Sequence, residues 1–225
     1  MHAGDRSCSK KLCFPKPGHE ARTPRSRRRA LLADLWRSWR IAKVRMETLN
    51  TNPPVPITNT YWVLPGQFLA GEYPGDCDEE VARTRISALL DAGIRTFMDL
   101  TEECEIAPGY SALLRALADD RRTEITYLRV PIPDRSVLSV WTMRCILDVL
   151  DRSLADENPA FAHCFAGIGR TGAVVGCYLK RHRLATDQDV MARIAELRRL
   201  MPYGRDPSPQ TPEQVRMVRT WKAGA

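Results

Sequence analysis

The stretch PAFAHCFAGIGRTGAVVGCYLKR, residues 159–181, decides the fold class of this 225-residue chain. Its apolar beginning predicts a short buried strand over 159–163, and its apolar end predicts a helix over 170–183. Gly167 and Gly169 lie between these elements and let the backbone curl so that successive N–H groups point inward. The following helix adds the positive end of its dipole. The segment therefore predicts an anion-binding loop at a strand-to-helix junction.

Cys164 and Arg170 give this loop its chemical character. A guanidinium group donates two parallel hydrogen bonds to two phosphate oxygens, which Lys cannot do. A positive field at a helix N-terminus favours the thiolate, which is the nucleophilic form of cysteine. A lone cysteine is usually a small buried hydrophobe, but the joint pattern is specific for phosphate. The expected phosphate-binding residues are Cys164, Phe165, Ala166, Gly167, Ile168, Gly169 and Arg170.

From Tyr61 onward the chain alternates strand and helix patterns. Short apolar runs predict strands, with a hairpin turn at Pro65 and Gly66, and apolar residues at helical spacing predict helices. This alternation indicates an α/β fold with a mostly parallel central sheet of about four to five strands flanked by helices. The expected strands are 61–64, 68–70, 94–100, 125–130 and 159–163, and the expected helices are 78–92, 109–119, 139–155, 170–183, 187–200 and 211–222.

The N-terminal part of the chain differs from the rest in charge. Residues 1–50 contain 13 Lys/Arg and 4 Asp/Glu, whereas residues 51–225 contain 21 and 23. Residues 1–55 are therefore expected to be a basic, largely disordered extension, and 56–225 a folded domain with no nucleic-acid partner. Residues 30–46 have the spacing of a basic amphipathic helix, which would pack on the domain, bind a partner or contact a membrane surface. Met46 is an alternative start of translation.

The seven cysteines are odd in number and form no CxxC pair, which argues against a disulfide framework and favours the reducing cytoplasm. Cys8, Cys13 and His19 have only loose metal-ligand spacing, so no metal site is expected. No run of 18 apolar residues predicts a transmembrane helix, and the N-terminus lacks the apolar core of a secretory signal.

The segment HCFAGIGRTG, residues 163–172, resembles the signature HCxxGxxR[ST] of the protein tyrosine and dual-specificity phosphatase superfamily. YWVLPGQFLAGEYPG, residues 61–75, and SPQTPEQV, residues 208–215, are similar to compact bacterial-type dual-specificity phosphatases. The resemblance extends over roughly residues 60–222 and implies a protein-tyrosine-phosphatase-like fold. It also implies a cysteine-dependent phosphomonoester hydrolase that forms a phosphocysteine intermediate and needs no cofactor.

The resemblance assigns roles to residues outside the phosphate loop. Expulsion of the leaving oxygen requires a proton, and Asp134 in PIPDRS, residues 131–136, is the expected general acid, with Asp99 as its rival. Thr171 is expected to assist breakdown of the intermediate, and His163 to orient the loop. Gln210 matches the glutamine that positions the hydrolytic water, and Gln214 is a second, weaker candidate. The same segment also fits a helix start with Thr211 as N-cap and Pro212 after it.

The expected substrate is a phosphorylated protein, with phosphotyrosine first and phosphoserine or phosphothreonine second. Phe165 and Ile168 occupy the variable loop positions where a lysine would favour a highly phosphorylated inositol ring. Arg135 and Arg205 are candidates for flanking the site, and Cys104 for pairing with an oxidised Cys164. A phosphatase of phosphoinositides or of RNA 5′ ends, and a non-catalytic phosphate-binding module, remain as alternatives.

Overall fold

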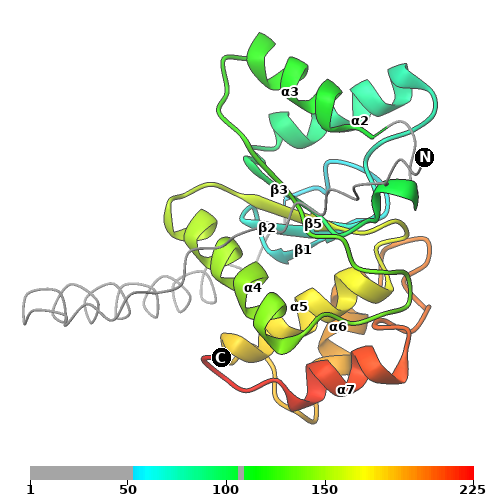
Figure 1. Ribbon diagram of the computed structural model, residues 1–225, viewed down its shortest axis with the longest axis vertical. Coiled ribbons are helices and arrows are strands. Elements are labelled where there is room, and N and C mark those ends of the chain that lie inside the picture. Colours follow the sequence, from blue (N-terminus) through cyan, green and yellow to red (C-terminus); the bar gives the residue numbers. More distant parts are fainter. Residues whose placement is uncertain (1–52, 106–108) are drawn as a thin grey trace, which may run out of the picture. The chain divides into compact units, whose positions relative to one another are not determined.

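The computed structural model describes residues 53–105 and 109–225, which belong to one compact unit, Thr48–Ala225 (Figure 1). The helix expected over 30–46 lies outside the described residues. The described chain forms a five-stranded sheet flanked by helices, as the sequence pattern predicts. In the described ranges, no helix has both the length and the apolar character that a bilayer-crossing segment needs.

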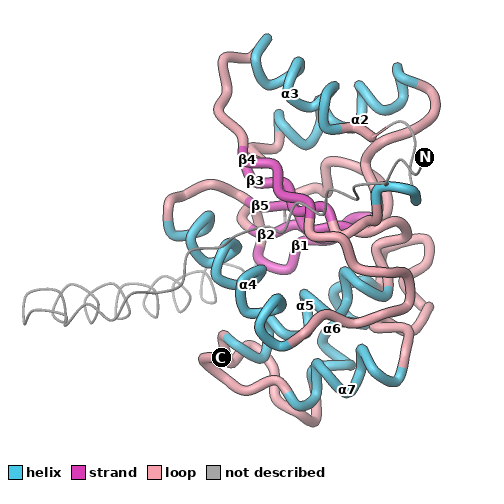
Figure 2. The backbone as a smooth tube through the Cα atoms, viewed as in Figure 1, coloured by secondary structure: helices cyan, strands magenta, loops and turns pink. Residues whose placement is uncertain are grey.

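The sheet is mostly parallel and has the strand order β1-β2-β5-β3-β4 (Figure 2). β1 and β2 form the expected antiparallel hairpin, in which Gly66 at the turn has a φ of +66° that favours glycine. The other strands of the sheet, β2, β5, β3 and β4 in order of position, run parallel to one another. The strands are β1 (Thr60–Leu64), β2 (Phe68–Gly71), β3 (Thr96–Asp99), β4 (Thr126–Arg129) and β5 (Ala160–His163).

Helices cover both faces of the sheet (Figure 1). One face carries α2 (Glu79–Asp91) and α3 (Ser111–Asp120), and the other carries α4 (Val140–Ala155), α5 (Gly169–Arg181), α6 (Val190–Arg198) and α7 (Pro212–Thr220). The ends of these elements lie within three residues of those that the sequence predicts. A short 3₁₀ turn, η1 (Glu103–Glu105), was not expected.

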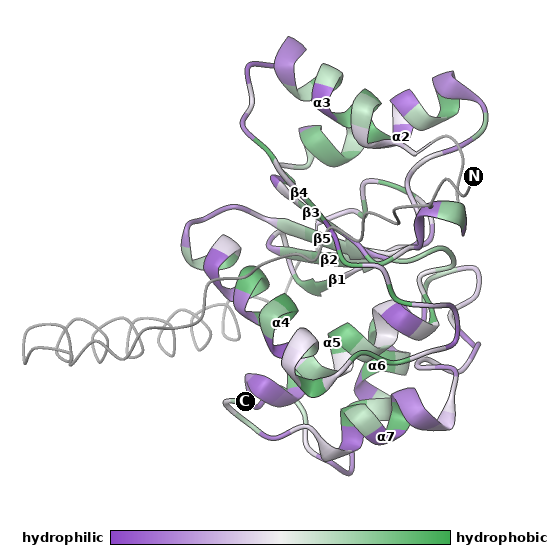
Figure 3. Ribbon diagram, in the orientation of Figure 1, coloured by the Kyte–Doolittle hydropathy of each residue, from purple (hydrophilic) through white to green (hydrophobic). Residues whose placement is uncertain are grey.

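Two hydrophobic clusters fill the space between the sheet and its helices, and apolar residues follow these buried faces in Figure 3. In β5, Ala160 and Ala162 pack in the cluster with α4 and α5, whereas Phe161 packs in the cluster with α2 and α3. This period of two is the pattern of a strand that is buried on both faces. Because its residues from Gly169 to Lys180 are all buried, α5 is the central helix of its layer.

The last residues of the four parallel strands lie in register. Gly71 is paired with His163, His163 with Asp99, and Asp99 with Arg129. The loops that follow these strands therefore begin at the same edge of the sheet. In open α/β sheets this edge is where ligands bind.

Candidate active site

The loop between β5 and α5 is held in one conformation by its neighbours. Gly167 has a φ of +69°, and a Cβ there would lie 2.4 Å from the backbone carbon of Gly71. Tyr73 N donates to Phe165 O at 3.0 Å, and Ser208 Oγ donates to Ile168 O at 2.7 Å. Only glycine fits position 167, because the backbone after β2 passes directly against it.

A cavity of about 160 Å³ opens over this loop at the N-terminus of α5. The Cys164 side chain and the Arg170 guanidinium lie at its floor and are only 2% and 3% exposed. The volume suits a group of a few heavy atoms rather than a large ligand. The lining residues are Glu105, Asp134, Arg135, Cys164, Phe165, Ala166, Gly169, Arg170 and Gln210. The structure thus brings together the predicted nucleophile, the arginine, the acid and the first glutamine.

Arg170 is fixed by groups on two other loops. Its Nη1 donates to Glu105 Oε2 at 2.7 Å and to the Ile132 carbonyl at 3.0 Å, and its Nη2 donates to Glu105 Oε1. Burial opposes the charge of Arg170, but the contacts with Glu105 outweigh burial and raise the pKa of the guanidinium. The hydrogen bonds from Arg170 lower the pKa of Glu105. The ion pair therefore stays charged and sets the direction of the guanidinium plane.

Glu105 is not singled out by the sequence pattern. It lies in the η1 turn, which follows β3 after a few residues and ends the run TEECE, residues 101–105, in which three of five residues are glutamates. That acidic run after a strand at the phosphate-loop edge is the one signal in the sequence that points to it. Cys104 in the same turn is exposed.

Asp134 lies at the mouth of the cavity. One of its carboxylate oxygens is 3.4 Å from Arg170 Nη2, and its side chain is 65% exposed. The turn that carries it is closed by Ser136 N, which donates to Pro133 O at 3.0 Å, and Arg135 within the turn has a φ of +57°. Asp134 is thus exposed to solvent beside the Arg170 guanidinium.

The rival carboxylate, Asp99, is fully buried and does not line the cavity. It accepts hydrogen bonds from Thr101 N, from the Tyr127 hydroxyl and from Arg129. Burial alone would raise the pKa of Asp99, but the charge of His163 when protonated and the bonds from Thr101 and Tyr127 lower it below its usual range. Both carboxylate oxygens of Asp99 therefore accept hydrogen bonds from buried or half-buried neighbours, and neither oxygen faces the cavity.

His163 precedes the nucleophile and is completely buried. Its Nε2 shares a hydrogen bond of 2.7 Å with the Tyr110 hydroxyl, and its Nδ1 lies 4.0 Å from Asp99 Oδ1. Burial lowers the pKa of His163 to about 4, so the imidazole is neutral near pH 7. This places His163 under the loop as an anchor, on the side away from the cavity that Cys164 lines.

The remaining predicted residues lie at different places around the loop. Thr171 is fully buried, and its hydroxyl donates to Gly71 O at 3.4 Å. Gln210 is close enough to Gly169 that a Cβ there would lie 2.7 Å from Gln210 Oε1. Gln214 is fully buried at the start of α7. Arg135 lines the cavity, whereas Arg205 is exposed and does not.

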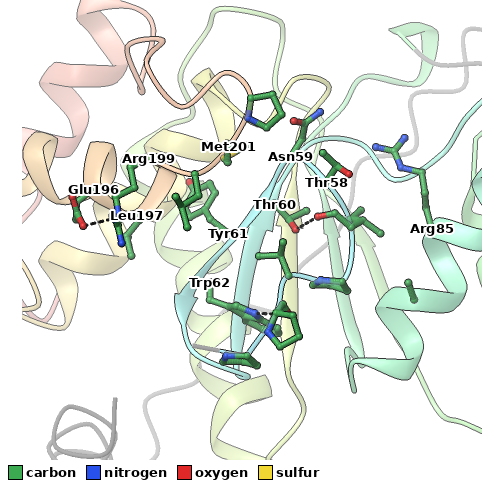
Figure 4. A pocket seen from close by; sticks show the side chains of 18 of the residues that line it. Thr58, Asn59, Thr60, Tyr61, Trp62, Arg85, Glu196, Leu197, Arg199 and Met201 are labelled. Carbon is green, nitrogen blue, oxygen red and sulfur yellow. Dashed lines mark hydrogen bonds and ion pairs between the residues drawn. The ribbon is translucent and has the colours of Figure 1, made fainter. Parts of the chain in front are cut away.

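A larger cavity of about 940 Å³ lies elsewhere in the domain (Figure 4). It is bounded by α6 with Leu197 on one side, by α2 with Arg85 on the other, and by Trp62 of β1 between them. No cysteine and no residue of the phosphate loop lines it. The candidate site is therefore the smaller of the two cavities, which is the one that Cys164 and Arg170 line.

Comparison with known proteins agrees with this geometry. Residues 77–183 match a family model described as "Polymorphic toxin system, DSP-PTPase phosphatase". The crystal structure of Tk-PTP in its active form is similar, with a TM-score of 0.57 and 19% identity over 73% of this chain and 96% of that chain. Kinase associated phosphatase with its catalytic cysteine changed to serine has a TM-score of 0.57 and 17% identity over 75% of this chain and 94% of that chain.

PTPMT1 in complex with PI(5)P gives a TM-score of 0.56 and 17% identity over 72% of this chain and 94% of that chain. At these identities the solved structures show the fold, which spans the described domain, and the family match adds the class of protein. Residues 77–183 thus match a dual-specificity phosphatase family model, and the described domain has the fold of these solved phosphatase structures.

Proposed function

We propose that the domain hydrolyses phosphotyrosine in proteins, and phosphoserine or phosphothreonine more slowly, through a phosphocysteine intermediate on Cys164. In the first step the Cys164 thiolate attacks phosphorus, the bond to the leaving oxygen breaks, and Asp134 gives that oxygen its proton. In the second step water attacks the phosphocysteine, Asp134 takes up the proton, and the P–S bond breaks to release inorganic phosphate. Arg170 and the loop N–H groups stabilise the equatorial oxygens in both steps.

The strongest support for this proposal is the position of Asp134 relative to Arg170 and Cys164. Its carboxylate lies 3.4 Å from Arg170 Nη2 at the rim of the cavity whose floor is Cys164. A phosphate held by Arg170 over Cys164 would direct its ester oxygen toward this rim. Gln210 lies against Gly169 of the loop and would hold the attacking water in the second step, and Thr171 would support the loop through its bond to Gly71 O.

The rim of the cavity supports an aryl phosphate as substrate. Phe165 is 56% exposed and offers a ring face for a phosphotyrosine side chain. A phosphoinositide is the second candidate, because Arg135 also lines the cavity and provides a cation for a further phosphate. PTPMT1, one of the similar structures, was solved with PI(5)P.

The proposal includes the organisation and surroundings of the chain. Residues 1–55 would be a separate basic extension and 56–225 the phosphatase domain. A free thiolate nucleophile needs reducing surroundings, which supports a cytoplasmic location. The near balance of charge over residues 51–225 supports a protein substrate rather than nucleic acid. Membrane contact by residues 30–46 is the less favoured role of the extension.

The test compares leaving groups in the Asp134→Asn variant. Phosphotyrosine peptides should slow by about 10²–10⁴-fold, whereas a highly activated aryl phosphate should slow much less, because its phenol departs without a proton. The alkaline limb of the phosphopeptide pH profile should disappear. Cys164→Ser should turn over neither substrate, and Asp99→Asn should slow both alike.

Equal slowing of both substrates by Asp134→Asn would show that another group donates the proton. Parallel assays with inositol lipids and with RNA carrying a 5′ phosphate would identify the substrate class. Wild-type protein that binds phosphate but releases none from any of these would indicate a binding module.

A further inference from the structure

Gln214 contacts both loops that the proposed mechanism must align. Its side chain is fully buried at the N-terminus of α7. Gln214 Oε1 accepts hydrogen bonds from the backbone N–H groups of Gln210 at 3.0 Å and of Thr211 at 3.2 Å. Gln214 Nε2 donates to the carbonyl of Ser136 at 2.9 Å. One amide therefore joins the glutamine segment to the turn that carries Asp134, although these segments are far apart in the sequence.

The Ser136 contact completes a two-point attachment of the acid turn. Arg170 binds the carbonyl of Ile132 at one end of the turn, and Gln214 binds the carbonyl of Ser136 at the other end. Asp134 lies between these points, and its carboxylate lies 3.4 Å from Arg170 Nη2. The position of this exposed side chain therefore depends on how firmly the backbone on either side is held.

Gln214 also lies against the phosphate loop. A Cβ on Gly169 would come within 3.1 Å of Gln214 Oε1 and 3.2 Å of Gln214 Nε2. The amide thus fills the space between the first turn of α5, the glutamine segment and the acid turn. A shorter or apolar side chain there would leave the Ser136 carbonyl without this donor.

We infer that Gln214 is a positioning residue that holds Asp134 at the distance from Cys164 and Arg170 which proton transfer requires. It acts through the backbone of Ser136 and does not touch the substrate. The inference rests on the proposed role of Asp134 as general acid. Proton transfer demands close alignment, so a loosened acid turn should act like a partial loss of the acid.

The experiment is the Gln214→Met variant, which keeps the length of the side chain and removes both polar functions. The ratio of kcat on phosphotyrosine peptide to kcat on a highly activated aryl phosphate should fall about tenfold relative to the full wild-type chain. In an Asp134→Asn background the same change should alter this ratio by less than about twofold, because both residues act on one step. Thermal unfolding verifies that each variant is folded.

The matched control is Thr211→Val. Thr211 Oγ1 caps α7 by accepting from Gln214 N at 3.3 Å, so the valine variant weakens the cap and leaves the contact with Ser136 in place. Its substrate ratio should equal that of the wild type.

If Gln214→Met does not fold, Gln214→Glu retains the acceptor for the two N–H groups, and its ionised form lacks the donor for Ser136. The substrate ratio of Gln214→Glu should then fall further below the wild-type ratio as pH rises.

Equal slowing of both substrates, or an unchanged ratio, would overturn the role of Gln214. If Asp134→Asn itself slows both substrates equally, both the proposed acid and this inference are wrong. If Asp134→Asn is selective and Gln214→Met is not, only this inference is wrong.

Discussion

His163 has its imidazole enclosed among the aromatic rings of Tyr73, Tyr110 and Phe161 beneath the phosphate loop. Burial lowers its pKa to about 4, whereas an unfolded histidine titrates near about 6.5. The unfolded chain therefore binds a proton at a pH where the folded chain does not. Stability from the neutral imidazole is fully present above about pH 6.5 and is lost as the pH falls toward 4.

This difference predicts a specific acid sensitivity. Between about pH 6.5 and 4 the free energy of unfolding should fall by up to about 3 kcal/mol on account of His163. Urea unfolding across this range should show a shallower fall for His163→Asn than for the wild type. An unchanged slope in His163→Asn would place the acid sensitivity in other groups.

At the scale of elements, the η1 turn supplies the counter-ion that orients Arg170. Glu105 occupies Nη1 and Nη2 of the guanidinium, so phosphate would bind through the edge formed by Nε and Nη2. Glu105→Gln replaces one acceptor oxygen with an amide donor that faces Arg170. The value of kcat/KM for a small aryl phosphate should fall about tenfold, which corresponds to about 1.4 kcal/mol.

Glu103→Gln is the control for this prediction, because Glu103 belongs to the same turn and is exposed. It removes the same charge without touching the site, so kcat/KM should stay near the wild-type value. If Glu105→Gln binds inorganic phosphate more tightly than the wild type and has the same kcat, Glu105 instead competes with the substrate for Arg170.

The elements themselves are predictable from the sequence, because apolar periodicity reports which face of a strand or helix is buried. The HCFAGIGRTG loop likewise marks Cys164 and Arg170 through its residue types and their spacing. Glu105 escapes such reasoning because a three-residue 3₁₀ turn has no periodicity and its partner Arg170 is 65 positions away. Gln214 is only a weak candidate in the sequence, because its bond to Ser136 spans 78 positions and depends on tertiary structure.

At the scale of the whole molecule, the lead-in to β1 is part of the domain. The Trp62 Nε1 donates to Pro54 O at 3.4 Å, the Thr60 hydroxyl donates to Ile57 O at 2.6 Å, and Ile57 is buried. All the residues that line the small cavity lie later in the chain, from Glu105 to Gln210. The domain is therefore expected to begin a few residues before the proposed boundary at residue 56, between the basic segment and Pro53.

Two shortened chains test this boundary. A chain that begins at Met46 loses all 13 Lys/Arg of residues 1–50 and keeps Pro53 to Ile57. Its kcat/KM on a small aryl phosphate should stay within about twofold of the full chain, because no charge in the site is altered. A chain that begins at Thr58 also loses Ile57 and uncovers Trp62, so it should be less stable by about 1.5–3 kcal/mol, the value of burying one large apolar side chain. A tenfold loss for the chain that begins at Met46, about 1.4 kcal/mol of barrier, would mean that residues 1–45 support catalysis.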